Sequence, residues 1–353
     1  MNPRRSNEWA EAVRAWTPPG TWTRLLTIDA HTEGEPLRVV LAGFPDLDGT
    51  TVLERRREAR NDHDLLRRAL MWEPRGHADM YGCIVGPPLT PEADVSVLFT
   101  HNEGFSTMCG HGIIGVVKVL LDVGLIRPTE PETSVGIDTP AGFVRATASV
   151  REGHVERTSF INVPSFASRL DAEADVPEVG TTRYDLAYGG AFYAYVAAED
   201  FGLSLSPHEY GRLIDLGRAI KNAVQNSDPP NHPDDEDLGF VYGTIFVGPA
   251  HDPAHHSRNV CVFADGEVDR SPTGTGVSGR LAIHHARGEI GTGESIVVES
   301  ILGTHFSGVV SHVTSVGGHA AVVPEVSGRA WITGRNEILI DPSDPVAHGF
   351  LIR

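Results

Sequence analysis

Cysteine is scarce in this chain, and so is positive charge. The 353 residues include only Cys83, Cys109 and Cys261, too few and too scattered for a disulfide framework or a zinc cluster. A cysteine with a functional role would therefore act as a free thiol. The 29 lysines and arginines face 47 aspartates and glutamates, which gives a formal net charge of −18. This balance argues against nucleic acid or an anionic membrane as the main partner and favours a small-molecule substrate.

Long apolar segments are lacking too. No uninterrupted apolar stretch approaches the roughly 20 residues that a membrane-spanning helix needs. The Arg4-Arg5 pair near the start is not followed by the apolar segment of a signal peptide. We therefore expect a cytoplasmic protein. The hydrophobic fraction of 40 % is typical of a globular chain, and the length allows two domains.

The sequence does contain an internal repeat. VSVLFTHNEGFSTMCGHGIIG, which starts at Val95, aligns without gaps with NVCVFADGEVDRSPTGTGVSG, which starts at Asn259. The alignment places Cys109 over Thr273, 164 residues later along the chain. Repetition of this kind indicates two structural units of similar build.

Each half shows the same succession of predicted elements. Apolar residues at helical spacing precede a Tyr-Gly strand, a glycine motif opens a second helix, and two alternating segments then form a hairpin. The predicted helices and hairpins occupy residues 58–72, 113–125, 142–163, 207–224, 277–287 and 307–326. We expect an α+β fold of two pseudo-symmetric domains, each a sheet wrapped round a central helix, with the active site in the cleft between them.

The expected boundaries follow from the repeat. The first domain comprises residues 21–170 together with 334–353, which have no counterpart in the first half and cross back to it. The second comprises 180–333, and the polar, turn-rich segment 165–182 contains the join. Residues 1–20 form an N-terminal extension with a short helix and no assignable chemistry.

Two G-x-G-x-x-G motifs, one at Gly110 and one at Gly274, suggest either of two ligands. A dinucleotide would require a βαβ unit, but the strands that follow are predicted to be antiparallel hairpins. A glycine-rich helix N-terminus also suits a small anion such as a carboxylate. Cys109 directly precedes the first motif, where the helix end is expected to lower the thiol pKa from about 8.5 toward neutrality. The alternative is that Cys109 is only a small buried residue.

The motifs resemble those of the proline racemase family, whose enzymes need no cofactor and share the diaminopimelate epimerase type of fold. The resemblance spans about residues 25–335. It is carried by Met108 to Gly112 and Asp269 to Gly276, and is supported by Ile28 to Pro36, Glu73 to Gly82 and Tyr188 to Tyr193. By this resemblance, Cys109 is the first of two cysteines that racemases place on opposite sides of the substrate Cα.

Thr273 stands where the family's second cysteine would be. Inversion at Cα needs an acid or base on both faces, and an unassisted hydroxyl lacks the acidity of a thiol. The Cys109/Thr273 pair is similar to that of the family's trans-3-hydroxy-L-proline dehydratases. In that substrate the Cα hydrogen and the 3-hydroxyl share one ring face, so a syn elimination needs one catalytic face. The product would be Δ1-pyrroline-2-carboxylate. The group that protonates the leaving hydroxyl stays open, with Cys109 as the simplest candidate.

The resemblance implies further roles. Asp269 is expected to pair with the ring ammonium, His111 to contact substrate, and backbone N–H groups of Gly110, His111, Gly274 and Thr275 to hold the carboxylate. Tyr81 and Phe263 either pack on the substrate ring or belong to core strands. No metal is expected, because the paired histidines match no known ligand spacing. These are His251, His255, His256, His284 and His285.

Two alternatives remain beside the dehydratase. One is a proline racemase or 4-hydroxyproline 2-epimerase in which Thr273 and a bound water replace the second thiol. The other is a catalytically inactive protein that binds cyclic amino acids. The chain retains Cys109, His111 and Asp269, which argues against this alternative. Members of the family often form homodimers.

Overall fold

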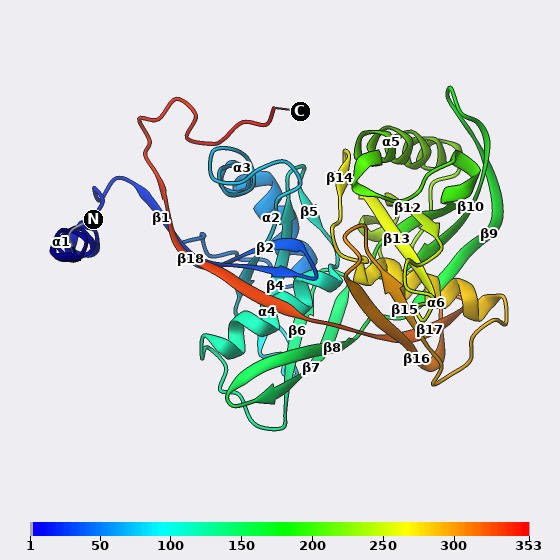
Figure 1. Cartoon of the computed structure of the whole chain (residues 1–353), viewed down its shortest axis with the longest axis horizontal. Coiled ribbons are helices and arrows are strands. Elements are labelled where there is room, and N and C mark those ends of the chain that lie inside the picture. Colours follow the sequence, from blue (N-terminus) through cyan, green and yellow to red (C-terminus); the bar gives the residue numbers. More distant parts are fainter. Residues whose placement is uncertain (1–2, 353) are drawn as a thin grey trace.

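The chain adopts a mixed fold of helices and strands, as the sequence predicts. A computed structural model describes residues 3–352 (Figure 1). Its α-helices are α1 (Pro3–Ala15), α2 (Val52–Asp62), α3 (Asp64–Met71), α4 (Gly110–Asp122), α5 (Tyr210–Ser227) and α6 (Gly274–Ala286).

The strands form one continuous hydrogen-bonded network. Those of the first half are β1 (Thr23–Thr32), β2 (Glu35–Ala42), β3 (Tyr81–Gly86), β4 (Val95–His101), β5 (Phe105–Ser106), β6 (Glu132–Thr139), β7 (Gly142–Arg151) and β8 (His154–Ile161). The remainder are β9 (Ser165–Val176), β10 (Gly180–Tyr188), β11 (Phe192–Ala197), β12 (Val241–Gly248), β13 (Ser257–Phe263), β14 (Glu267–Val268), β15 (Ser295–Glu299), β16 (His305–Val316), β17 (His319–Gly328) and β18 (Ala330–Ile340).

Strand pairing confirms the internal repeat. In the first half β3, β4 and β5 pair antiparallel in order, β4 pairs parallel with β6, and β6, β7 and β8 continue antiparallel. In the second half β12, β13 and β14 pair antiparallel, β13 pairs parallel with β15, and β15, β16 and β17 continue antiparallel. Two equivalent units therefore place the two glycine motifs in equivalent positions.

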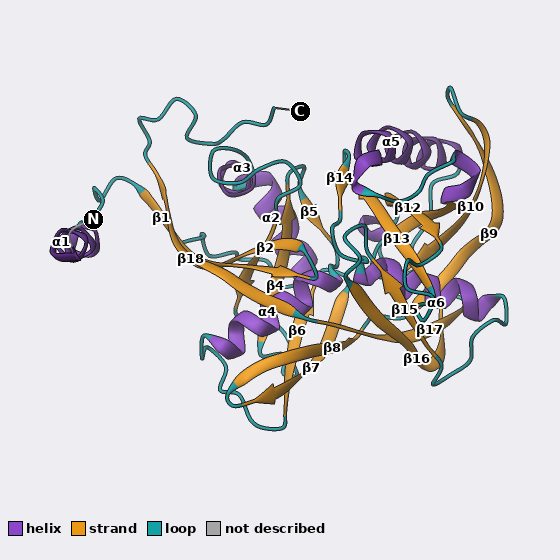
Figure 2. Cartoon of the chain, in the orientation of Figure 1, coloured by secondary structure: helices purple, strands orange, loops and turns teal. Residues whose placement is uncertain are grey.

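Each unit wraps its strands round one central helix (Figure 2). Helix α4 contacts β1, β2, β7, β8 and β18, whereas α6 contacts β9, β10, β16 and β17. Burial on every side explains why α4 is apolar nearly all round. The helix is followed by Gly124 at φ +80°, a left-handed conformation that glycine adopts without steric cost.

Two segments differ from the predictions. Residues 58–72, expected as one helix, belong to two helices, because α2 ends and α3 begins at His63. The segment 165–182, expected to be rich in turns, is mostly strand, since β9 and β10 form an antiparallel pair with a turn between Val176 and Gly180. Its polar composition reflects the exposed side chains in the middle of β9 rather than a linker.

Strands also cross between the halves. β18 pairs with β1 from Thr23↔Ile340 onward, and β17 pairs with both β8 and β9. The domain boundaries given above stay a prediction. The N-terminal extension contains α1, which Figure 1 shows apart from the body of the molecule. Within residues 3–352, none of the helices has the length and apolar character to cross a membrane.

Candidate active site

The N-termini of α4 and α6 meet where the two halves join. A Cβ added to Gly110 would lie 2.6 Å from Cα of Gly274, and one added to Gly274 would lie 2.7 Å from Cα of Gly110. Only glycine permits so close an approach. The two helices therefore direct their unpaired N–H groups and positive dipole ends at one place.

A small cavity lies at this meeting point. It is lined by all seven residues that the sequence nominated, together with five others that are mainly aromatic. The nominated residues are Cys109, Gly110, His111, Asp269, Thr273, Gly274 and Thr275, and the others are Tyr81, Met108, Tyr193, Tyr242 and Phe263.

Cys109 is the N-cap residue of α4. Its Sγ accepts a hydrogen bond from the Gly112 N–H at 3.2 Å and lies 3.2 Å from Nδ1 of His111. The expectation of a lowered thiol pKa is wrong. Burial raises the Cys109 pKa well above its ordinary value and outweighs the hydrogen bond from Gly112 and the influence of the nearby Tyr81 hydroxyl, while the charges of Asp269 and Glu35 raise it further.

Thr273 occupies the equivalent position before α6, but its geometry differs from that of Cys109. Its φ is +64°, which is unusual for a β-branched residue, and its side chain makes no cap hydrogen bond to the helix. The Thr273 hydroxyl is buried and has no hydrogen-bond partner among the described residues.

Asp269 is a buried carboxyl group that faces the cavity. Burial raises its pKa to about 6, and this is opposed by hydrogen bonding from Ser271 and by the charge of Arg270. Glu35 lies close enough for the charge of Asp269 to raise its pKa, which burial raises first. Its Oε2 accepts a hydrogen bond from the Arg270 N–H at 2.6 Å. Two neighbouring buried carboxyl groups make this side of the cavity favourable for a cation.

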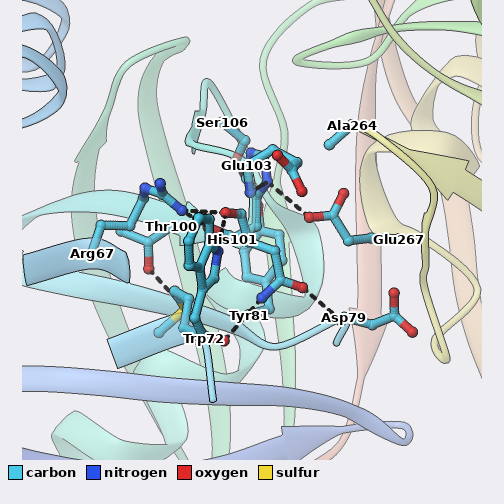
Figure 3. Close-up of polar contacts among 12 residues, drawn as sticks. Arg67, Trp72, Asp79, Tyr81, Thr100, His101, Glu103, Ser106, Ala264 and Glu267 are labelled. Atoms are coloured by element: carbon cyan, nitrogen blue, oxygen red, sulfur yellow. Dashed lines mark hydrogen bonds and ion pairs between the residues drawn. The ribbon is translucent and has the colours of Figure 1, made fainter. Parts of the chain in front are cut away.

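His111 and the aromatic side chains complete the wall. Burial lowers the His111 pKa to about 3, so its imidazole is neutral. The Tyr81 ring packs edge-on against His111 at 4.6 Å and against Phe263 at 5.9 Å. Tyr81 and Phe263 thus line the cavity and are also part of β3 and β13. Figure 3 shows Tyr81 together with its neighbours His101, at the end of β4, and Ser106, at the end of β5.

Sequence reasoning did not nominate Tyr242, Tyr193 or Glu35 as site residues. With a few residues of slippage, the internal repeat matches Tyr81-Gly82 with Tyr242-Gly243, so it contained a signal for Tyr242. Tyr193, whose hydroxyl lies 2.9 Å from Oγ1 of Thr275, falls in the quoted segment Tyr188 to Tyr193. Nothing in the sequence indicates that Glu35 lies beside Asp269, because these residues meet only across the two halves.

Comparison with known proteins gives a consistent family. A sequence profile described as "Proline racemase" matches residues 27–351. The chain is 45 % identical over 341 residues to "Trans-3-hydroxy-L-proline dehydratase" of Colwellia psychrerythraea, covering 96 % of each chain. It is also 45 % identical over 329 residues to "3-hydroxyproline 2-epimerase" of Burkholderia multivorans, covering 93 % of this chain and 98 % of the relative.

A solved structure matches over nearly the whole length. The hydroxyproline epimerase of Agrobacterium vitis, solved with bound trans-4-hydroxy-L-proline, superposes with a TM-score of 0.90 at 34 % identity. The match covers 94 % of this chain and 96 % of the other.

Proposed function

Because the chain belongs to the proline racemase family, we propose that its cavity binds a cyclic amino acid and that the enzyme dehydrates trans-3-hydroxy-L-proline to Δ1-pyrroline-2-carboxylate. The observation that carries this proposal is the asymmetry of the cavity. Cys109 stands at the start of one helix, and Thr273, whose hydroxyl has no hydrogen-bond partner among the described residues, stands at the start of the other. We also assign the fold to the diaminopimelate epimerase type, with the two domains bounded as predicted above.

In the proposed complex, each charged group of the substrate faces a part of the cavity with the opposite charge. Its carboxylate lies against the N–H groups at the starts of α4 and α6, contributed by Gly110, His111, Gly274 and Thr275. Its ammonium group faces Asp269. The ring packs against Tyr81 and Phe263. As the Cα proton leaves, negative charge spreads into the carboxylate, and the helix ends stabilise that charge more than they stabilise the ground state.

Substrate binding also helps to ionise Cys109. The charges of Asp269 and Glu35 raise the thiol pKa of Cys109. An ammonium group beside Asp269 offsets part of that charge, so the thiolate forms more readily when substrate is bound. The thiolate then removes the Cα proton, the electrons form the C2–C3 double bond, and the 3-hydroxyl departs from the same face. Tautomerisation of the resulting enamine gives the cyclic imine.

The test is incubation of the purified protein with trans-3-hydroxy-L-proline and a reagent that traps cyclic imines. We expect stoichiometric Δ1-pyrroline-2-carboxylate, identified by NMR. Turnover of a different amino acid, with no imine from this one, would overturn the proposal. Tight binding of hydroxyproline without turnover would instead identify an inactive binding protein.

Epimerisation is the second candidate, because one of the similar relatives is named as a 3-hydroxyproline 2-epimerase. It would require Thr273 with a water molecule to act on the second face. Inversion at Cα in D2O, observed with incorporation of deuterium, would favour it. Exchange of the Cα hydrogen without inversion would agree with a single active thiol.

The Asp269 carboxyl group should set the acidic limb of the pH profile. Asp269 must be ionised to pair with the ammonium group, and its pKa in the free enzyme is about 6. Below pH 6 we expect kcat/KM to fall by about tenfold more per pH unit than protonation of Cys109 alone would cause, because Asp269 also loses its charge there. Asp269→Asn should lower kcat/KM by about 10²-fold and abolish this limb. An unchanged limb in the variant would show that another group controls it.

Thr273→Cys should add a second acid–base group on the opposite face. We expect the variant to invert the Cα of L-proline at a rate at least about tenfold above the wild-type background, measured by chiral chromatography. Inversion no faster than the background would mean that more than residue 273 separates elimination from racemisation in this cavity.

A further inference from the structure

The hydroxyl of Tyr81 lies beside a second hydroxyl group at the edge of the cavity. Strands β3 and β5 both pair with β4, and this brings the Tyr81 hydroxyl to 2.5 Å from Oγ of Ser106 (Figure 3). The Tyr81 and Cys109 side chains both line the cavity, and the Tyr81 ring packs against His111, whose Nδ1 lies 3.2 Å from Sγ of Cys109. Tyr81 and Ser106 are 2 % and 1 % exposed, so the arrangement is shielded from solvent.

The proposed elimination needs a proton donor on this side. A syn elimination places the departing 3-hydroxyl on the ring face that Cys109 attacks, and hydroxide leaves readily only when it is protonated. His111 also lies on this side, but its imidazole is neutral, and a neutral imidazole is a weaker acid than a phenol. Cys109 accepts a cap hydrogen bond from the Gly112 N–H and, in the proposed reaction, is already the group that takes the Cα proton.

We propose that Tyr81, oriented by Ser106, is the acid that protonates the leaving 3-hydroxyl and that it recovers its proton from Cys109. This inference rests on the proposed dehydratase function. The Cys109 thiolate takes the Cα proton, and the C–H electron pair becomes the C2–C3 double bond as the C3–O bond breaks. The leaving oxygen takes the Tyr81 proton to form water. Tyr81 takes the proton now on Cys109, so both residues return to their starting states.

Electrostatics are consistent with this division of roles. Burial raises the Tyr81 pKa well above its ordinary value, and negative charge on Cys109 raises it further. The phenol therefore keeps its proton while the thiol is ionised. Conversely, the nearby Tyr81 hydroxyl lowers the Cys109 pKa and so favours the thiolate. The two groups share one proton between them, which is the condition for a relay.

Tyr81→Phe separates the acid from the base, because it keeps the ring and removes only the hydroxyl. We expect kcat for dehydration to fall by about 10³-fold. Exchange of the Cα hydrogen of L-proline in D2O, which needs only Cys109, should fall by no more than about tenfold, the size of a lost hydrogen bond to the thiolate. Elimination from trans-3-chloro-L-proline, whose chloride needs no proton, should also fall by no more than about tenfold.

Two further variants complete the experiment. Ser106→Ala should lower the rate of dehydration by about tenfold and affect Cα hydrogen exchange less. This variant replaces Tyr81→Phe in the experiment if Tyr81→Phe does not fold. Tyr188→Phe is the matched control, since Tyr188 is a buried tyrosine outside the cavity lining whose hydroxyl has no hydrogen-bond partner among the described residues. Its dehydration rate should stay within about twofold of wild type.

The outcomes are distinguishable. If the rates of dehydration, exchange and chloride elimination all fall by the same factor in Tyr81→Phe, Tyr81 acts only by positioning Cys109, and the inference is overturned. Dehydration at the wild-type rate in that variant would overturn it too, while leaving the dehydratase function intact. If the wild-type enzyme produces no cyclic imine, the proposed function fails and this inference fails with it.

Discussion

Cys109→Ser is expected to lower kcat for dehydration by about 10³- to 10⁴-fold, the range associated with loss of a positioned general base. A serine hydroxyl at this buried position stays protonated and cannot take the Cα proton. The fold should be preserved, because serine is a favoured N-cap residue and can accept the Gly112 hydrogen bond in place of sulfur. Imine formation and Cα hydrogen exchange should be lost together, since both depend on the same base.

The control for this variant is another buried cysteine. Cys83 is fully buried within β3 and does not line the cavity, so Cys83→Ala should retain activity within about threefold while losing some stability. Thermal unfolding of both variants separates folding from catalysis. Turnover by Cys109→Ser within about tenfold of wild type would contradict the assignment of Cys109 as the base.

The sequence contains enough information to predict the architecture around the site. The repeat relates Cys109 to Thr273, and the helical spacing after each glycine motif places both at helix N-termini. Close approach of Gly110 and Gly274 then follows from pseudo-symmetry, because equivalent ends of two equivalent units meet at their common axis. The local sequence pattern was enough to predict these two helices, because each of them is determined by its own residues.

Properties that depend on the environment were less predictable. The pKa of Cys109 rises because the cavity is buried and contains Asp269 and Glu35, and neither effect is visible in the residues next to Cys109. Likewise, β9 is polar in sequence but is held by pairing with β10 and β17, which lie later in the chain. The Tyr81–Ser106 contact arises from strand pairing across β4 and has no local sequence signature.

Gly274→Ala is expected to be strongly damaging although Gly274 has no functional side chain. A Cβ at Gly274 would lie 2.7 Å from Cα of Gly110 and 3.4 Å from Cζ of Phe160. The first contact is with backbone and cannot be relieved by rotating a side chain. The two helix ends must therefore separate, which widens the cavity and moves the N–H groups that would hold the carboxylate. Because displacements of about 1 Å can cost 10²-fold in rate, we expect kcat/KM to fall by at least that factor.

Gly211→Ala provides the matched control, because Gly211 is in the first turn of α5 and an added Cβ there meets nothing within 4 Å. Alanine has the higher helix propensity, so this variant should keep wild-type kinetics and equal or greater thermal stability. For Gly274→Ala, the loss should be larger in binding of a planar pyrrole carboxylate, measured by calorimetry, than in binding of the corresponding pyrrole without the carboxylate. Equal losses for both ligands would show that the two helix ends do not hold the carboxylate, and the charge-based orientation of the substrate would then be wrong.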